Sequence, residues 1–90
     1  MIIEYARSFD QNFAKLSVEL QAKARQTVAM FIDCYAAKHF PKGLRVHKCG
    51  PFINISFTMK HRNFVLPIPG GIKFVFIGDH EDADRYLGKN

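Results

Sequence analysis

Residues 44–59 read LRVHKCGPFINISFTM, and the architecture that we expect for the whole chain starts from them. Apolar and polar residues alternate on both sides of Gly50-Pro51, a pattern typical of two strands joined by a turn. In the second run Ile53 and Ile55 point one way and Asn54 points the other way. We therefore expect an antiparallel sheet with one buried face and one face exposed to water.

Helical periodicity precedes these strands. Ser8 with Gln11 three positions later predicts a capping box for a first helix. Ser17 predicts the N-cap of a second, longer helix that ends near Ala37. The two helices are joined almost directly, so we expect a helical hairpin, and the apolar residues 1–6 before it predict a short strand.

Two further strands are predicted after the first pair, at residues 64–68 and 72–77. Pro69-Gly70-Gly71 joins them as a hairpin connection in which glycine can supply a positive φ. Pro67 weakens the ladder of its strand or places it at an edge. The polar segment 79–85 and the apolar pair Tyr86-Leu87 follow, and we expect the chain to fray only after that pair.

This order of elements predicts an α+β domain that spans residues 1–90. It has an N-terminal strand, a helical hairpin and about four antiparallel strands in one twisted sheet, covered on one face by the helices. The first residues contain Glu4 and no long apolar stretch, so we expect a cytoplasmic protein without a membrane segment. Cys34 and Cys49 match no metal or redox motif and are expected to be free thiols.

The net charge of +5 is unevenly distributed along the chain. No acidic residue lies between Asp33 and Asp79. Seven basic residues lie in that interval: Lys38, Lys42, Arg45, Lys48, Lys60, Arg62 and Lys73. A sheet built from this segment has a cationic surface that suits a polyanion such as RNA. The alternative is that the basic residues only keep the protein soluble.

Three short segments carry hydrogen-bond donors and proton carriers: 45–48 (RVHK), 60–62 (KHR), and Asp79-His80 with Tyr86 beyond it. Adjacent antiparallel strands can bring all three together. These segments lack an activated Ser or Cys nucleophile, but RNA carries its own nucleophile in the 2′-hydroxyl. A base, a cation on the phosphate and an acid at the leaving oxygen suffice for its cleavage. The histidine spacings match no known zinc motif, so we expect no metal and no other cofactor.

The order of elements and four segments resemble the RelE/ParE superfamily of toxins from bacterial type II toxin–antitoxin systems. Nearly the whole chain is covered by the resemblance. The segments are RSFDQNFAKL (7–16), GLRVHK (43–48), HRNFVL (61–66) and IGDHEDADRYL (77–87). Arg62 falls where the family has a phosphate-stabilising arginine.

The resemblance implies a ribosome-dependent mRNA endonuclease that is silenced by a cognate antitoxin. By position, Lys48 or His47 is the base, Arg62 stabilises the phosphate, His80 is the acid and Tyr86 orients a nucleobase. The resemblance and the charge pattern together predict an RNA- and ribosome-binding set of Lys38, Lys42, Arg45, Lys60 and His61.

Two other functions remain open from the sequence. One is a ParE-like toxin that is not a nuclease and binds DNA gyrase. The other is an inactive RNA- or antitoxin-binding module, for which the observation is Ser56 at a position where relatives often have arginine. The alternation of side chains adds one structural expectation. His47 falls on the polar face of its strand, whereas Arg62 falls on the same face as the apolar residues of its own strand. For both to reach one site, the chain must be irregular near residues 60–63.

Overall fold

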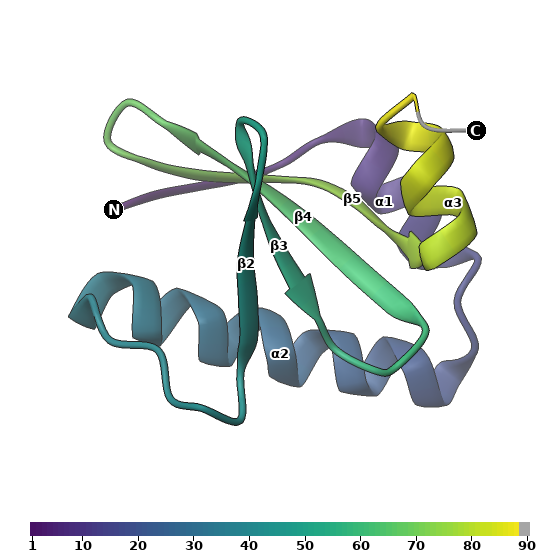
Figure 1. Cartoon of the computed structure of the whole chain (residues 1–90), viewed down its shortest axis with the longest axis horizontal. Coiled ribbons are helices and arrows are strands. Elements are labelled where there is room, and N and C mark those ends of the chain that lie inside the picture. The colour runs from purple at the N-terminus through teal and green to yellow at the C-terminus, as the bar shows by residue number, and fades with distance from the viewer. Residues whose placement is uncertain (89–90) are drawn as a thin grey trace.

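The computed structural model describes residues 1–88 and contains a five-stranded sheet in the order β1-β5-β4-β3-β2 (Figure 1). Strand β1 runs parallel to β5, and every other pair of neighbours is antiparallel. The predicted α+β architecture is confirmed. In chain order the elements are β1 (Ile2–Tyr5), α1 (Arg7–Ala14), α2 (Val18–Ala37), β2 (Arg45–Cys49), β3 (Phe52–Ser56), β4 (His61–Ile68), β5 (Gly71–Asp79) and α3 (His80–Tyr86).

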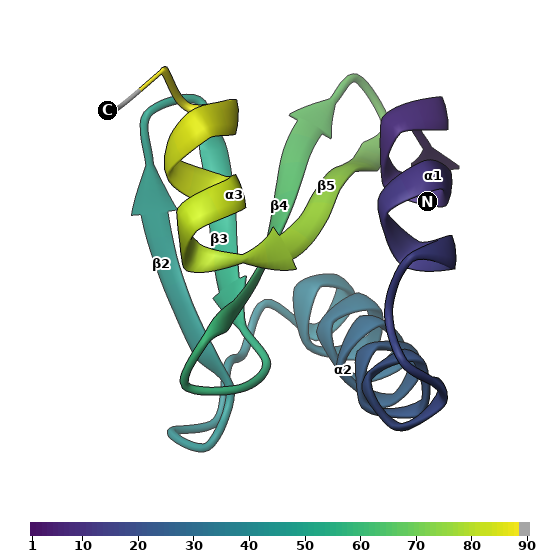
Figure 2. The ribbon, with the colours of Figure 1, turned by 90° about the vertical axis from the view of Figure 1, so that its right-hand side faces the viewer.

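Helices α1 and α2 cover one face of the sheet, which we call the α2 face (Figure 2). Helix α2 turns Ala24 and Phe31 into the core, where both are fully buried. The ring of Phe31 meets that of Phe74 edge-on, with the centroids 6.3 Å apart. Burial of such large aromatic side chains supplies much of the stability of a small domain. No helix in the described part of the chain is long and apolar enough to cross a membrane.

The opposite face, which we call the α3 face, is partly covered by helix α3 (Figure 2). Ala83 of this helix is buried against a second apolar cluster that contains Phe64 and Phe76. The Asp79 carboxylate caps the helix by accepting from the Asp82 amide at 2.8 Å. The sequence analysis did not predict α3, because a short, strongly charged segment forms a helix only when tertiary packing supports it.

One of the two predicted helix starts is confirmed and the other is wrong. Ser17 caps α2, and its side chain accepts from the Leu20 amide at 3.2 Å. Ser8 makes no capping box, because α1 already begins at Arg7. The hydroxyl of Ser8 instead donates to the carbonyl of Val75 at 2.7 Å, which ties α1 to β5.

The predicted irregularity near residues 60–63 is also wrong. The register of β4 with β5 shifts instead between Phe64 and Val65, whose partners are Phe76 and Phe74. Val75 is the extra residue of this bulge. Arg62 shares its face with buried Phe64 without any irregularity between them, because α3 makes the α3 face partly apolar.

The turn from β4 to β5 depends on glycine at two positions. Gly70 has a φ of +78°, which suits the third position of a type II turn after Pro69. Gly71 lies directly against the backbone of Ile2, so a methyl group added there would overlap the Ile2 carbonyl.

Gly71→Ala is expected to destabilise the fold by about 1–3 kcal/mol, because it pushes β1 away from β5. Chemical unfolding monitored by circular dichroism measures this change. Gly43→Ala is the matched control, since nothing lies within 4 Å of its added methyl group. Equal stability of the two variants would contradict the close approach of β1.

Candidate functional site

Strand register brings two of the predicted catalytic residues to the same face of the sheet. Arg45 pairs with Ser56, and Ser56 pairs with Arg62, so these residues form one row across β2, β3 and β4. The next row begins with His47, which pairs with Asn54. Because paired residues project from the same face of a sheet, His47 and Arg62 lie on the same side.

A cleft of about 290 Å³ lies where these rows meet α3. Both Arg62 and His80 line this cleft, and His47 stands beside it as the cross-strand partner of Asn54. Arg62 and His80 thus share a cleft, and His47 projects from the same face of the sheet two strands away from Arg62. We call this site the Arg62 cleft; it is lined by Cys49, Asn54, Arg62, Phe64, His80, Ala83, Asp84 and Leu87.

The turn between β3 and β4 holds Arg62 in position. Its Nη1 donates to the carbonyls of Thr58, Met59 and His61 at 3.4, 3.3 and 3.1 Å. The same turn is tied to the start of α3, because the His80 amide donates to the Lys60 carbonyl at 2.8 Å. These contacts occupy one nitrogen of the guanidinium and leave the rest of its planar fork for an anion.

Arg62 has no carboxylate partner among residues 1–88, although Asp84 lines the same cleft. The one ion pair of this part of the chain joins Asp82 to Arg85 on α3. Within this pair Arg85 donates a hydrogen bond to the Asp82 carboxylate. The hydrogen bond and the negative charge of Asp82 raise the pKa of Arg85 above its ordinary value. An anion that binds Arg62 therefore has no ion pair of the described residues to displace.

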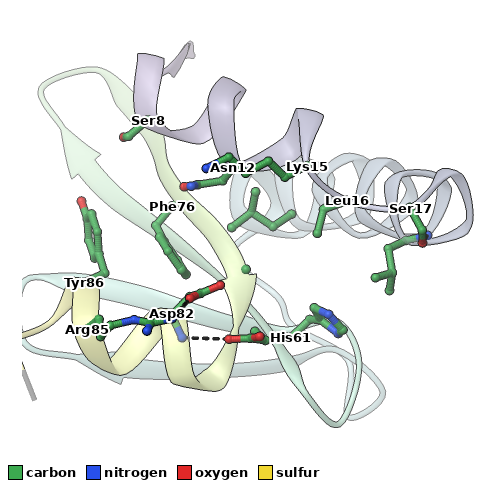
Figure 3. Close-up of a pocket in the computed structure, with 14 residues that line it drawn as sticks. Ser8, Asn12, Lys15, Leu16, Ser17, His61, Phe76, Asp82, Arg85 and Tyr86 are labelled. Atoms are coloured by element: carbon green, nitrogen blue, oxygen red, sulfur yellow. Dashed lines mark hydrogen bonds and ion pairs between the residues drawn. The ribbon is translucent and has the colours of Figure 1, made fainter. Parts of the chain in front are cut away.

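Tyr86 does not line the Arg62 cleft, although its ring packs on Phe64, which does. Its ring packs on Phe76 at a centroid distance of 4.9 Å, and on Phe52 and Phe64 at 5.9 Å. It lines a separate groove of about 610 Å³ between α1 and α3, which Figure 3 shows. Whereas Tyr86 lines this groove, His80 lines the Arg62 cleft.

The remaining predicted residues fall into two groups. Lys48 has the opposite strand parity to His47 and pairs with Ile53, so it points away from the Arg62 cleft. Lys38 and Lys42 are exposed in the connection between α2 and β2. In contrast, Arg45, Lys60 and His61 line one common pocket at the end of the sheet.

Sequence reasoning missed several residues that the structure adds to these sites. Cys49, Asn54 and Asp84 line the Arg62 cleft, and Cys49 is a free thiol, as predicted. Lys23 lines the pocket at the end of the sheet. Its sequence context is an outward position on a helix, which carries no signal of a site. No group of three or more His, Cys, Asp or Glu residues in the described chain is arranged to hold a metal ion.

Comparison with known proteins identifies the fold. No protein-family profile and no curated protein matches the sequence. Among solved structures, a chain of the RelB–RelE antitoxin–toxin complex from Methanococcus jannaschii superposes with a TM-score of 0.71 at 10% identity. The match covers 93% of this chain and 98% of that chain.

Two further structures agree with this fold. A copper-bound mutant toxin from Helicobacter pylori has a TM-score of 0.71 at 15% identity and covers 89% of this chain and 94% of its own. A chain of the E. coli DinJ–YafQ complex has a TM-score of 0.61 at 13% identity, with 90% and 94% covered. The chain therefore has the fold of RelE-like toxins.

Proposed function

We propose that this protein is the toxin of a type II toxin–antitoxin pair and that it cleaves messenger RNA on the ribosome. The observation that supports the proposal is a cleft lined by Arg62 and His80, with His47 on the same face of the sheet. The shared fold with RelE-like toxins supports the toxin role, and the structures of antitoxin–toxin complexes support a cognate antitoxin as partner. The site of action is then the cytoplasm, where messages are translated.

The proposed reaction uses the RNA itself as nucleophile. Neutral His47 removes the proton of a 2′-hydroxyl, and the oxygen attacks the adjacent phosphorus. Arg62 binds the non-bridging oxygens, where negative charge grows in the transition state. Protonated His80 donates its proton to the 5′-oxygen as that oxygen leaves. The products are a 2′,3′-cyclic phosphate and a 5′-hydroxyl, and proton exchange with water restores both histidines.

The alternation of side chains along strand β2 favours His47 rather than Lys48 as the proposed base. His47 points to the face that carries Arg62, whereas Lys48 points to the opposite face. A side chain must reach the proton that it removes, so geometry takes precedence over residue type. Both His47 and His80 are exposed, which allows the exchange of protons with water.

The chemistry of the products tests this proposal. The purified protein is incubated with ribosomes that carry a defined message, and the new RNA ends are analysed. We expect a 2′,3′-cyclic phosphate, and we expect no cut where the nucleotide before the scissile phosphate is 2′-deoxy. Ends made by attack of water would contradict the mechanism. Intact messages in cells whose replication is blocked would point to DNA gyrase as target instead.

The toxin role has a separate test. Expression of this chain alone is expected to arrest growth, and co-expression of its cognate antitoxin is expected to restore it. Normal growth at high expression of folded protein would contradict the toxin role.

A further inference from the structure

A second pocket lies at the end of the sheet, where α2, the start of β2 and the turn between β3 and β4 meet. Its volume is about 620 Å³. Lys23, Arg45 and Lys60 line it from these three different elements, and His61 lines it as well. We call it the Lys23 pocket; Thr58 and Met59 of the turn also line it.

Among the residues that the structure describes, no acidic side chain lines the Lys23 pocket. Within residues 1–88, none of its three permanent cations forms an ion pair. The guanidinium of Arg45 has only a long contact, 3.7 Å, with the sulfur of Met59. Like charges that converge without counter-charges repel one another, and a bound anion relieves that repulsion. The arrangement therefore favours an anionic ligand.

Hydrogen bonds in the turn between β3 and β4 indicate which ring nitrogen of His61 carries a proton. The hydroxyl oxygen of Thr58 accepts from the amides of Lys60 at 3.1 Å and His61 at 3.0 Å. Its own proton is then directed to Nδ1 of His61, at 2.7 Å. With Nδ1 accepting, the neutral ring carries its proton on Nε2. The pocket thus presents N–H donors from lysine, arginine and histidine, which match the oxygens of a phosphodiester.

The position of the pocket relates it to the Arg62 cleft. Arg45 and Arg62 belong to the same row, with Ser56 between them. Two strand spacings separate their backbones by about 10 Å, so one extended strand of RNA can reach both arginines.

We propose that the Lys23 pocket binds a phosphate of single-stranded RNA other than the one that is cleaved, and that Lys23 completes this pocket. The inference rests on the proposed function, since it assigns a second contact to the same RNA. It adds a residue of α2 to an interface that is otherwise made by the sheet and its turn. The pocket would hold the RNA in register while the Arg62 cleft acts on a neighbouring phosphate.

The test compares Lys23→Gln with Lys15→Gln, which removes the same charge from an exposed lysine outside the pocket. The probe is a short single-stranded RNA with 2′-deoxy nucleotides, so that it binds without being cut. For Lys23→Gln we expect the slope of log K against log salt concentration to fall by about 0.7, the value for one phosphate contact. Lys60→Gln should give a similar loss, and Lys15→Gln should keep the slope of the unmodified protein.

The outcomes separate this inference from the function on which it rests. An unchanged slope in Lys23→Gln, or no binding of the probe by the unmodified protein, overturns the pocket assignment even if ribosome-bound messages are cut. Loss of binding to a polyglutamate peptide without a change in the RNA slope also overturns it, in favour of an acidic protein segment. The absence of cleavage on ribosomes, with an RNA slope that still depends on Lys23, contradicts the proposed nuclease but supports the pocket.

Discussion

Arg62→Gln is expected to slow RNA cleavage by about a hundredfold to a thousandfold. Arg62 is the cation of the cleft, and three turn carbonyls hold it in place while no carboxylate of the described chain neutralises it. Glutamine keeps an N–H donor on a shorter side chain, but it loses the positive charge and the planar guanidinium fork. Single-turnover cleavage of a ribosome-bound message measures the effect, and growth arrest on expression should disappear in Arg62→Ala.

Two controls separate chemistry from folding in this experiment. Arg25→Gln removes an arginine that lies over the ring of Phe13, 5.1 Å from its centroid, and it should leave cleavage unchanged. Arg62→Lys keeps the charge without the bidentate geometry, so its rate should lie between those of the unmodified protein and Arg62→Gln. Unchanged toxicity of a folded Arg62→Ala protein would rule out the proposed role of Arg62.

His47→Gln and His80→Gln are each expected to lower the cleavage rate by about a hundredfold to ten-thousandfold. The two variants should differ in their pH dependence. A base works only when it is unprotonated, so loss of His47 removes the fall in rate toward acidic pH. An acid works only when it is protonated, so loss of His80 removes the fall toward alkaline pH. Rate profiles at saturating RNA measure both limbs.

Lys48→Gln and His39→Gln are the matched controls for this pair. Lys48 follows His47 directly on β2 and so points to the opposite face of the sheet. His39 is exposed after the end of α2. Neither change should remove a limb of the pH profile. The opposite result would be that Lys48→Gln removes the fall in rate toward acidic pH while His47→Gln keeps it. Lys48 would then be the base, and the assignment of His47 from its face of the sheet would be wrong.

Much of the fold could be predicted because its signals are local. The Ser17 cap, the turn at Pro69-Gly70 and the alternation in residues 44–59 each depend on interactions within a few residues of chain. The predictions that failed depend on distant contacts. Ser8 bonds to the carbonyl of Val75, 67 positions away, rather than to its own helix.

The candidate site shows the same division. The sequence indicated His47, Arg62 and His80 as donors and proton carriers within or beside a segment without acids. It did not predict α3, whose packing makes part of the α3 face apolar and lets Arg62 share that face with Phe64. The predicted bulge near residues 60–63 was therefore unnecessary, and the register shift lies in β5 instead.

The amino-acid sequence by itself determined the order of helices and strands as far as β5 and the excess of positive charge in the sheet, because both follow from residue type and short-range spacing. Only the tertiary structure decided which charged side chains share a pocket. Lys23, Arg45 and Lys60 line one pocket, and Tyr86 and His80 line two different ones, because of the way α2 and α3 pack on the sheet. Which residues share a pocket depends on how whole helices and strands pack against one another, and this packing cannot be predicted from a short segment of sequence.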